Sequence, residues 1–189
     1  MNEAATGCLS GLETLLKEQA GHGSAPVEIW NPPYCGDIGM AIRRDGVWLY
    51  QGSPIGRMPL VKLFARVLRR DPDGRHYLVT PVEKIDVVVA DAPFLAVEME
   101  AKGNGRNQDL TFRTNVDDVV RCGPGHPIRF EVEAGSDGLK PYLLVRGRLE
   151  ALLTRAIYYD LVELAIVEDD QIGIWSGGQF FPMQQAATG

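Results

Sequence analysis

Six polar side chains are the residues of this chain best suited to bind an anion. An arginine guanidinium binds phosphate or carboxylate through two parallel hydrogen bonds, and a lysine adds a compact positive charge. An asparagine amide and a tyrosine ring could hold the remainder of such a ligand. The pattern therefore predicts one ligand-binding site. Its members are Lys84, Arg113, Asn115, Arg148, Arg155 and Tyr158.

An ordinary structural role competes with ligand binding at each of these positions. Arg146 and Arg148 are two residues apart and share a strand face, and Arg155 follows at the turn into a predicted helix. Together with Lys84 and Arg113 they could form a basic pocket on an otherwise acidic protein. Arginines at such a corner equally suit ion pairs with nearby Asp and Glu residues. Lys84 stands beside Glu83, which would suit a surface ion pair as well as an anion site.

The sequence contains no motif of a known catalytic or metal site. The histidines His22, His76 and His126 lack the spacing of metal ligands, so we expect no metal and no other cofactor. The glycine-rich stretch 103–106 lacks the Lys-Ser/Thr of a phosphate-binding loop and favours a hairpin turn. We therefore assign no catalytic residue. In an enzyme, Glu83 or His126 would be the candidate general base.

Composition and charge restrict the partners that we expect. The 189 residues are 45% hydrophobic and carry a net charge of -6, with an isoelectric point near 5.1. This acidic balance argues against bulk nucleic-acid binding, which needs a basic surface. No apolar run reaches the length of a membrane span, and the N-terminus does not resemble a signal peptide. Three widely spaced cysteines argue against a disulfide framework, so we expect a soluble, cytoplasmic protein without membrane insertion.

Turn signals and apolar alternation predict an α+β fold with mostly antiparallel sheets. Asp45-Gly46 and Gly177-Gly178 each mark a tight hairpin. The regular spacing of short strands in the second half suggests a bent sheet or barrel capped by a helix. The predicted strands are 38–43, 47–50, 75–80, 85–90, 94–102, 109–114, 116–121, 128–134, 142–148, 172–175 and 179–181.

Apolar residues at helical spacing predict three helices. One short amphipathic helix covers residues 9–20, and a second covers residues 57–70 with Pro59 near its start. A longer apolar stripe predicts a third helix over residues 149–165.

The two halves repeat the order hairpin, helix, strand, which suggests an internal duplication. Arg57 and Arg155 lie 155 − 57 = 98 residues apart, and we take their helices as the corresponding elements. The predicted organisation is an N-terminal helix and linker over residues 1–26, a small α+β domain over 27–84 and a larger domain over 85–189. Two such domains would offer a ligand site between them.

Six groups of residues carry a resemblance to a known family. They are Trp30-Asn31-Pro32-Pro33 with Gly36-Asp37, Arg44-Asp45-Gly46 with Trp48, Leu63-Phe64 with Val67-Leu68, residues 77–84, residues 91–94, and Phe112 with Thr114-Asn115. In these segments the chain resembles a family of uncharacterised proteobacterial proteins that carry a domain of unknown function, and the resemblance extends over nearly the whole chain from about residue 27. It implies a duplicated core, a second half like a pleckstrin-homology fold, a nucleotide-like ligand at the domain interface and a role in signal transduction.

The leading hypothesis is a non-enzymatic protein that binds a small anionic or nucleotide-like ligand between its domains. A second hypothesis is an enzyme acting on a phosphorylated small molecule. A third is a protein-interaction adaptor, which an exposed apolar patch near Trp30 and Pro33, or near Trp175 and Phe180, would favour. The sequence leaves these three alternatives open.

Overall fold

The computed structural model describes Thr14 and residues 25–135 and 138–185, with the backbone alone at residues 184 and 185. The helix predicted over residues 9–20 lies outside the described residues except at Thr14. The chain forms two compact units, one up to Pro93 and one from Phe94 onward. The boundary predicted after residue 84 falls inside a strand of the first unit, and the units divide after Pro93 instead.

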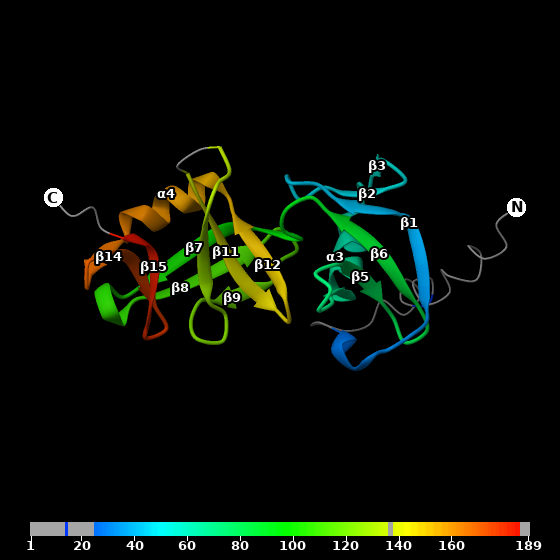
Figure 1. The fold of residues 1–189 in the computed structure, drawn as a ribbon, viewed down its shortest axis with the longest axis horizontal. Helices are drawn as coiled ribbons and strands as arrows, with labels where there is room; N and C mark the ends of the chain where they lie inside the picture. Colours follow the sequence, from blue (N-terminus) through cyan, green and yellow to red (C-terminus); the bar gives the residue numbers. More distant parts are fainter. Residues whose placement is uncertain (1–13, 15–24, 136–137, 186–189) are drawn as a thin grey trace, which may run out of the picture. The chain divides into compact units, whose positions relative to one another are not determined.

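The first unit is a six-stranded sheet with one α-helix (Figure 1). The strand order is β3-β2-β1-β6-β5-β4, in which β1 and β6 run parallel and all other neighbours antiparallel. Two three-stranded meanders therefore meet at a central parallel pair. The elements are η1 (Val27–Ile29), β1 (Tyr34–Ile42), β2 (Trp48–Tyr50), β3 (Ser53–Pro54), α3 (Met58–Arg66), β4 (Leu68–Arg70), β5 (His76–Val79) and β6 (Lys84–Val89).

The helix α3 packs its apolar side onto this sheet. Pro59 stands in the first turn, where a missing backbone N–H leaves no hydrogen bond unmade. Val61 and Phe64 are buried, and the Phe64 ring lies 6.2 Å from the ring of Trp48 on β2. This packing holds the strands on which the polar residues of the first unit stand.

The prediction of one helix over residues 57–70 is wrong at its C-terminal end. The helix stops at Arg66, and Leu68–Arg70 form β4, where Leu68 pairs with Leu78 of β5. The predicted helix extended too far because Val67 and Leu68 are apolar and buried, as the core-facing residues of a helix would be. Cross-strand pairing outweighs helix propensity over these three residues.

The second unit contains a second six-stranded sheet, which curls into a half-barrel (Figure 1). Its order is β10-β11-β12-β7-β8-β9, with β12 and β7 parallel and the other neighbours antiparallel. The α+β class with a barrel-like second half is confirmed, while the pleckstrin-homology likeness stays a prediction. The elements are β7 (Phe94–Lys102), η2 (Gly105–Asn107), β8 (Asp109–Thr114), β9 (Val119–Arg121), β10 (Ile128–Val132), β11 (Leu139–Arg146) and β12 (Leu149–Leu153).

The two six-stranded sheets have the same topology. When the strands of the second sheet are renumbered from one, its order becomes 4-5-6-1-2-3, which read backwards is the order of the first sheet. The helices stand at different points, since α3 lies between β3 and β4 whereas α4 (Arg155–Glu163) follows β12. Equivalent first strands start at Tyr34 and Phe94, an offset of 94 − 34 = 60. The two units are therefore related through their sheets, and the predicted offset of 98 between the helices is wrong.

The predicted helix over residues 149–165 is a strand followed by a shorter helix. Leu149, Ala151 and Leu153 of β12 are buried while the residues between them are partly exposed, which is the alternation of a strand. Ala151 pairs with Phe94 in the central parallel ladder. The helix α4 begins only at Arg155, so this arginine lies in its first turn.

A three-stranded antiparallel sheet completes the second unit. It consists of β13 (Ile166–Glu168), β14 (Gln171–Ser176) and β15 (Gln179–Gln185), and it confirms the predicted final hairpin. Gly177 and Gly178 both have positive φ, as a two-residue hairpin turn requires. A side chain at Gly177 would meet the backbone of Gly123 at 3.0 Å, so the turn packs closely against the β9–β10 connection.

Candidate functional site

Lys84 belongs to the first unit, and the other five predicted site residues belong to the second. The Nζ atom of Lys84 lies 3.2 Å from Oδ2 of Asp71 and 4.5 Å from the ring centre of Tyr77. Burial alone would raise the pKa of Asp71, but hydrogen bonds from Arg69 and Lys84 outweigh it and lower that pKa. Lys84 is thus already paired within its own unit, with a carboxylate that it shares with Arg69.

Arg113 is held between two carboxylates on the surface of the second sheet. Its Nε donates to Oε2 of Glu98 at 2.7 Å, and its Nη1 donates to Oδ1 of Asp117 at 2.8 Å. These bonds, mainly the one to Glu98, raise the pKa of Arg113 and hold the pKa of Glu98 below its ordinary value. In this structure Arg113 therefore forms surface ion pairs, the structural alternative to ligand binding.

Asn115 ties the end of β8 to the start of β7. Its Oδ1 accepts a hydrogen bond from the backbone N–H of Leu95 at 3.0 Å, and its own N–H donates to the Leu95 carbonyl at 2.9 Å. The amide oxygen that could have recognised a ligand therefore satisfies backbone in this structure.

Arg148 is exposed in the tight turn between β11 and β12, next to Gly147 with φ of 53°. Within the described residues its guanidinium forms no ion pair. The nearby Arg146 forms an ion pair with Asp118, and its Cζ atom lies 5.0 Å from the ring centre of Phe94. Arg148 is therefore a surface charge outside any described pocket.

Arg155 and Tyr158 do come together, in a pocket of about 380 Å³ that we call the α4 pocket. They stand three residues apart on α4 and so share one helix face. Strand β11 contributes Lys140 and Pro141 to the lining, and β12 contributes Leu152. The full lining is Glu133, Gly138, Leu139, Lys140, Pro141, Leu152, Leu153, Arg155, Tyr158 and Tyr159.

The charges around the α4 pocket favour an anion. Arg155 and Lys140 each contribute one positive charge and Glu133 one negative charge, which gives 1 + 1 − 1 = +1 on a protein of net charge -6. The guanidinium of Arg155 makes no ion pair with any residue that the structure describes. Its five N–H donors remain available to a ligand.

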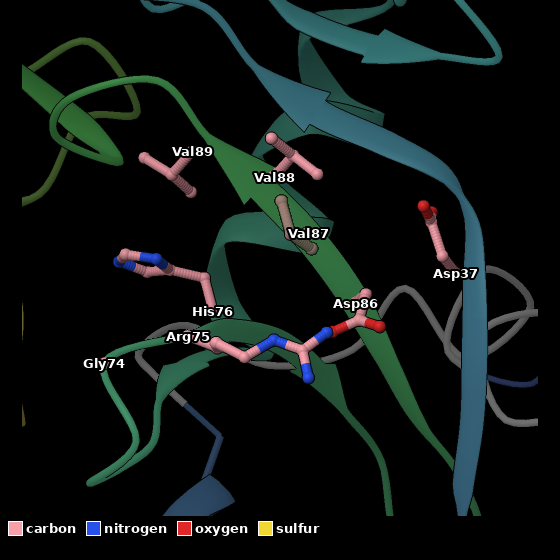
Figure 2. A pocket seen from close by; sticks show the side chains of 8 residues that line it. All are labelled: Asp37, Gly74, Arg75, His76, Asp86, Val87, Val88 and Val89. Carbon is pink, nitrogen blue, oxygen red and sulfur yellow. The ribbon is translucent and has the colours of Figure 1, made fainter.

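A second pocket of about 380 Å³ lies on the first sheet and was not predicted (Figure 2). Figure 2 shows Arg75 reaching across to Asp86, while Asp37 stands apart on β1. Nη2 of Arg75 lies 2.6 Å from Oδ1 of Asp86, and the Tyr34 hydroxyl donates to Oδ2 of the same carboxylate. The signal for it in the sequence is an aspartate in the middle of the apolar strand β6.

Titratable groups beside this first-sheet pocket have shifted pKa values. Burial, together with the nearby charge of Arg70, lowers the pKa of His76 to about 4. Burial and a hydrogen bond to Asp73 raise the pKa of Tyr77 to about 12. The hydrogen bond to Asp86 raises the pKa of Tyr34. At neutral pH His76 is therefore neutral, and both tyrosines are protonated.

The two candidate general bases belong to different units. Glu83 is 1% exposed and belongs to the first unit, whereas His126 belongs to the second, with its Nδ1 3.1 Å from the Leu144 carbonyl oxygen. Among the described residues no group of three or more His, Cys, Asp or Glu side chains is placed to hold a metal ion. His22 lies outside the described residues. The predictions of no catalytic residue and no metal stay predictions.

The described helices are all too short or too polar to cross a membrane.

Two family models together match residues 25–183. Residues 25–92 match the N-terminal domain described as "Domain of unknown function (DUF1285)", and residues 93–183 match the C-terminal domain of "Protein of unknown function (DUF1285)". The junction of the two matches lies within one residue of the division of the two compact units. No curated protein matches the chain.

Two crystal structures resemble the chain. A DUF1285 family protein from Silicibacter pomeroyi is 48% identical, covers 90% of this chain and 94% of its own, and superimposes with a TM-score of 0.85. A DUF1285 family protein from Shewanella baltica is 29% identical over 66% of this chain and 91% of its own, with a TM-score of 0.52. The resemblance to a proteobacterial family of unknown function is confirmed, and the chain belongs to the DUF1285 family.

Proposed function

We propose that this protein binds a small anionic ligand in the α4 pocket. The observation that carries the proposal is the guanidinium of Arg155, which lines the pocket without an ion-pair partner among the described residues. A charged hydrogen bond to such a group contributes more than a neutral one, and a planar guanidinium adds bidentate geometry. Lys140 of β11, which also lines the pocket, adds a second positive charge.

The remaining walls of the α4 pocket suit a planar, partly apolar group attached to the anion. The rings of Tyr158 and Tyr159 lie 6.0 Å apart and are tilted by 47°, and Leu139, Pro141 and Leu152 provide apolar surface. Aromatic faces stack on planar rings of many kinds. A nucleotide-like ligand combines such a ring with a phosphate. Binding of this kind would suit a sensor in signal transduction, the role that the family resemblance implies.

The experiment is titration calorimetry of the protein with nucleoside monophosphates and with phosphorylated metabolites, preceded by a thermal-shift screen of the same compounds. We expect the Arg155→Gln variant to bind the best compound at least tenfold more weakly, a loss that corresponds to about 1.4 kcal/mol. The matched control is Arg148→Gln, which removes the same charge from an exposed turn outside the pocket and should change the affinity less than twofold.

Two results would contradict the proposal. One is equal weakening by Arg155→Gln and Arg148→Gln, because the effect would then come from net charge alone. The other is a screen in which no anionic compound raises the melting temperature, although a ligand at 100 times its Kd should add about 2.7 kcal/mol of stability.

A further inference from the structure

The most acidic stretch of the chain is also one of its most apolar surfaces. Residues 159–170 contain five acidic residues and no Lys or Arg, so this short segment carries a charge of -5 in a protein of net charge -6. Four of the twelve large apolar side chains that are exposed among the described residues also belong to it. We call it the α4–β13 surface. Its apolar members are Tyr159, Val162, Ile166 and Val167, and its acidic members are Asp160, Glu163, Glu168, Asp169 and Asp170.

The structure shows why these side chains point outward. Helix α4 buries Ile157 and Leu161, so the residues on its other side face solvent, including Val162 at 41% exposure. Strand β13 pairs with β14 alone among the described strands, and its Val167 is 64% exposed. Exposed apolar residues thus occur both on the helix and on the edge strand that follows it. Four exposed large apolar side chains within nine residues are typical of a surface that a partner covers.

The acidic side chains restrict what that partner can be. Asp160, Glu163, Asp169 and Asp170 are exposed, whereas Glu168 is engaged by Arg106 and by the indole N–H of Trp175. A nucleic acid or an anionic membrane would be repelled by this charge. A second copy of the chain would bring the same negative charge against itself. Only a basic partner matches both the charge and the apolar side chains.

We infer that the α4–β13 surface docks a basic amphipathic segment of another protein. Apolar side chains of that segment would cover Val162 and Val167, and its Lys or Arg residues would face the surrounding carboxylates. Side-chain docking is favoured over addition of a strand, because β13 offers an open edge of only three residues. This surface is distinct in charge from the α4 pocket, although Tyr159 borders both.

The test uses the full chain and a fluorescein-labelled helical peptide of Lys and Leu, with a Glu and Leu peptide of equal length as the control. Fluorescence anisotropy should show binding of the basic peptide alone. Hydrogen exchange of the complex should show new protection within residues 159–170. Protection elsewhere, binding of both peptides, or binding of neither would overturn the inference. Protection of this segment that rises with protein concentration in the absence of peptide would mean that a second copy is the occupant, and would also overturn it.

Matched variants separate this surface from general attraction to an acidic protein. Val167→Ser combined with Glu163→Gln should weaken peptide binding about tenfold, since it removes an apolar contact and a charge from the surface. The control pair is Val119→Ser with Glu100→Gln, whose residues are exposed on β9 and β7 to a similar degree. All four positions are exposed, so unchanged melting temperatures are expected. Equal weakening by the two pairs would overturn the inference.

Discussion

The first-sheet pocket and the α4 pocket have the same volume, but among the described residues only the first contains an arginine that is paired with a carboxylate. In the first-sheet pocket, Arg75 is bonded to Asp86, whose side chain is only 8% exposed. In the α4 pocket, Arg155 has no such carboxylate among the described residues. A positive group that already has its counter-charge stabilises the fold, while one without it is available to a ligand. Pocket volume alone therefore does not separate the two pockets, whereas the pairing of their arginines does.

The largest effect should come from breaking the internal pair. Asp86→Ala removes the acceptor of both Arg75 and Tyr34, so we expect a loss of about 2 to 3 kcal/mol in the free energy of unfolding. Urea denaturation measures this loss. An unfolding midpoint equal to that of the unmodified protein would show that the Asp86 interactions contribute no stability.

The pH dependence of folding stability should also come from the first-sheet pocket, through His76. The pKa of His76 is lowered to about 4 in the folded state, so the unfolded chain binds a proton more readily between pH 6.5 and 4. Folding stability should therefore fall as the pH falls through that range, by at most about 2 kcal/mol because the ring is partly exposed. Denaturation at several pH values should show a flatter profile for His76→Gln, and an unchanged slope would contradict this assignment.

A single substitution should give Arg155 a carboxylate partner inside the α4 pocket, as Arg75 has in the first-sheet pocket. Leu152→Glu would place a carboxylate on the β12 wall, within the lining that Arg155 shares. We expect anion affinity to fall about tenfold, because the guanidinium would then have an internal partner. Calorimetry against Leu152→Gln, which keeps the shape without the charge, is the check. Equal anion affinities of the two variants would show that binding does not depend on Arg155 lacking an internal ion-pair partner.

The smallest effect should be that of Arg155→Gln on the free energy of unfolding. Arg155→Gln removes no ion pair with a described residue, so the free energy of unfolding should change by less than about 0.5 kcal/mol. Thermal melting without ligand measures it. A markedly lower melting temperature would mean that Arg155 has a structural role, and the contrast between the pockets would then disappear.

The sequence predicted strands well where glycine-containing turns bound them. The predicted strands over residues 94–102 and 109–114 agree with β7 and β8, and the hairpin at Gly177-Gly178 is present. Both long helices were predicted too long. Leu68 and Leu149 are buried in strands whose apolar spacing also fits a helix, and only pairing with the neighbouring strand, β5 or β11, decides between the two.

The candidate site was predicted in part for a similar reason. Arg155 and Tyr158 share a face because of local helical geometry, which a sequence reveals. Lys140 was missed because β11 brings it to α4 only in the folded unit. The pairing of Glu98 with Arg113 depends on the register of β7 against β8, which no local pattern fixes. The sequence therefore could not tell which arginines were already neutralised.

The central parallel pair of each sheet has a consequence for how the chain is made. Tyr34 pairs with Lys84 and Phe94 with Ala151, so these ladders close segments of 84 − 34 = 50 and 151 − 94 = 57 residues. Closing segments of that length is slow compared with forming a hairpin. On the ribosome, the first unit can complete its sheet only after β6 has emerged, and the second only after β12. A fragment that ends before either strand would expose the unpaired edge of β1 or β7 and would tend to aggregate.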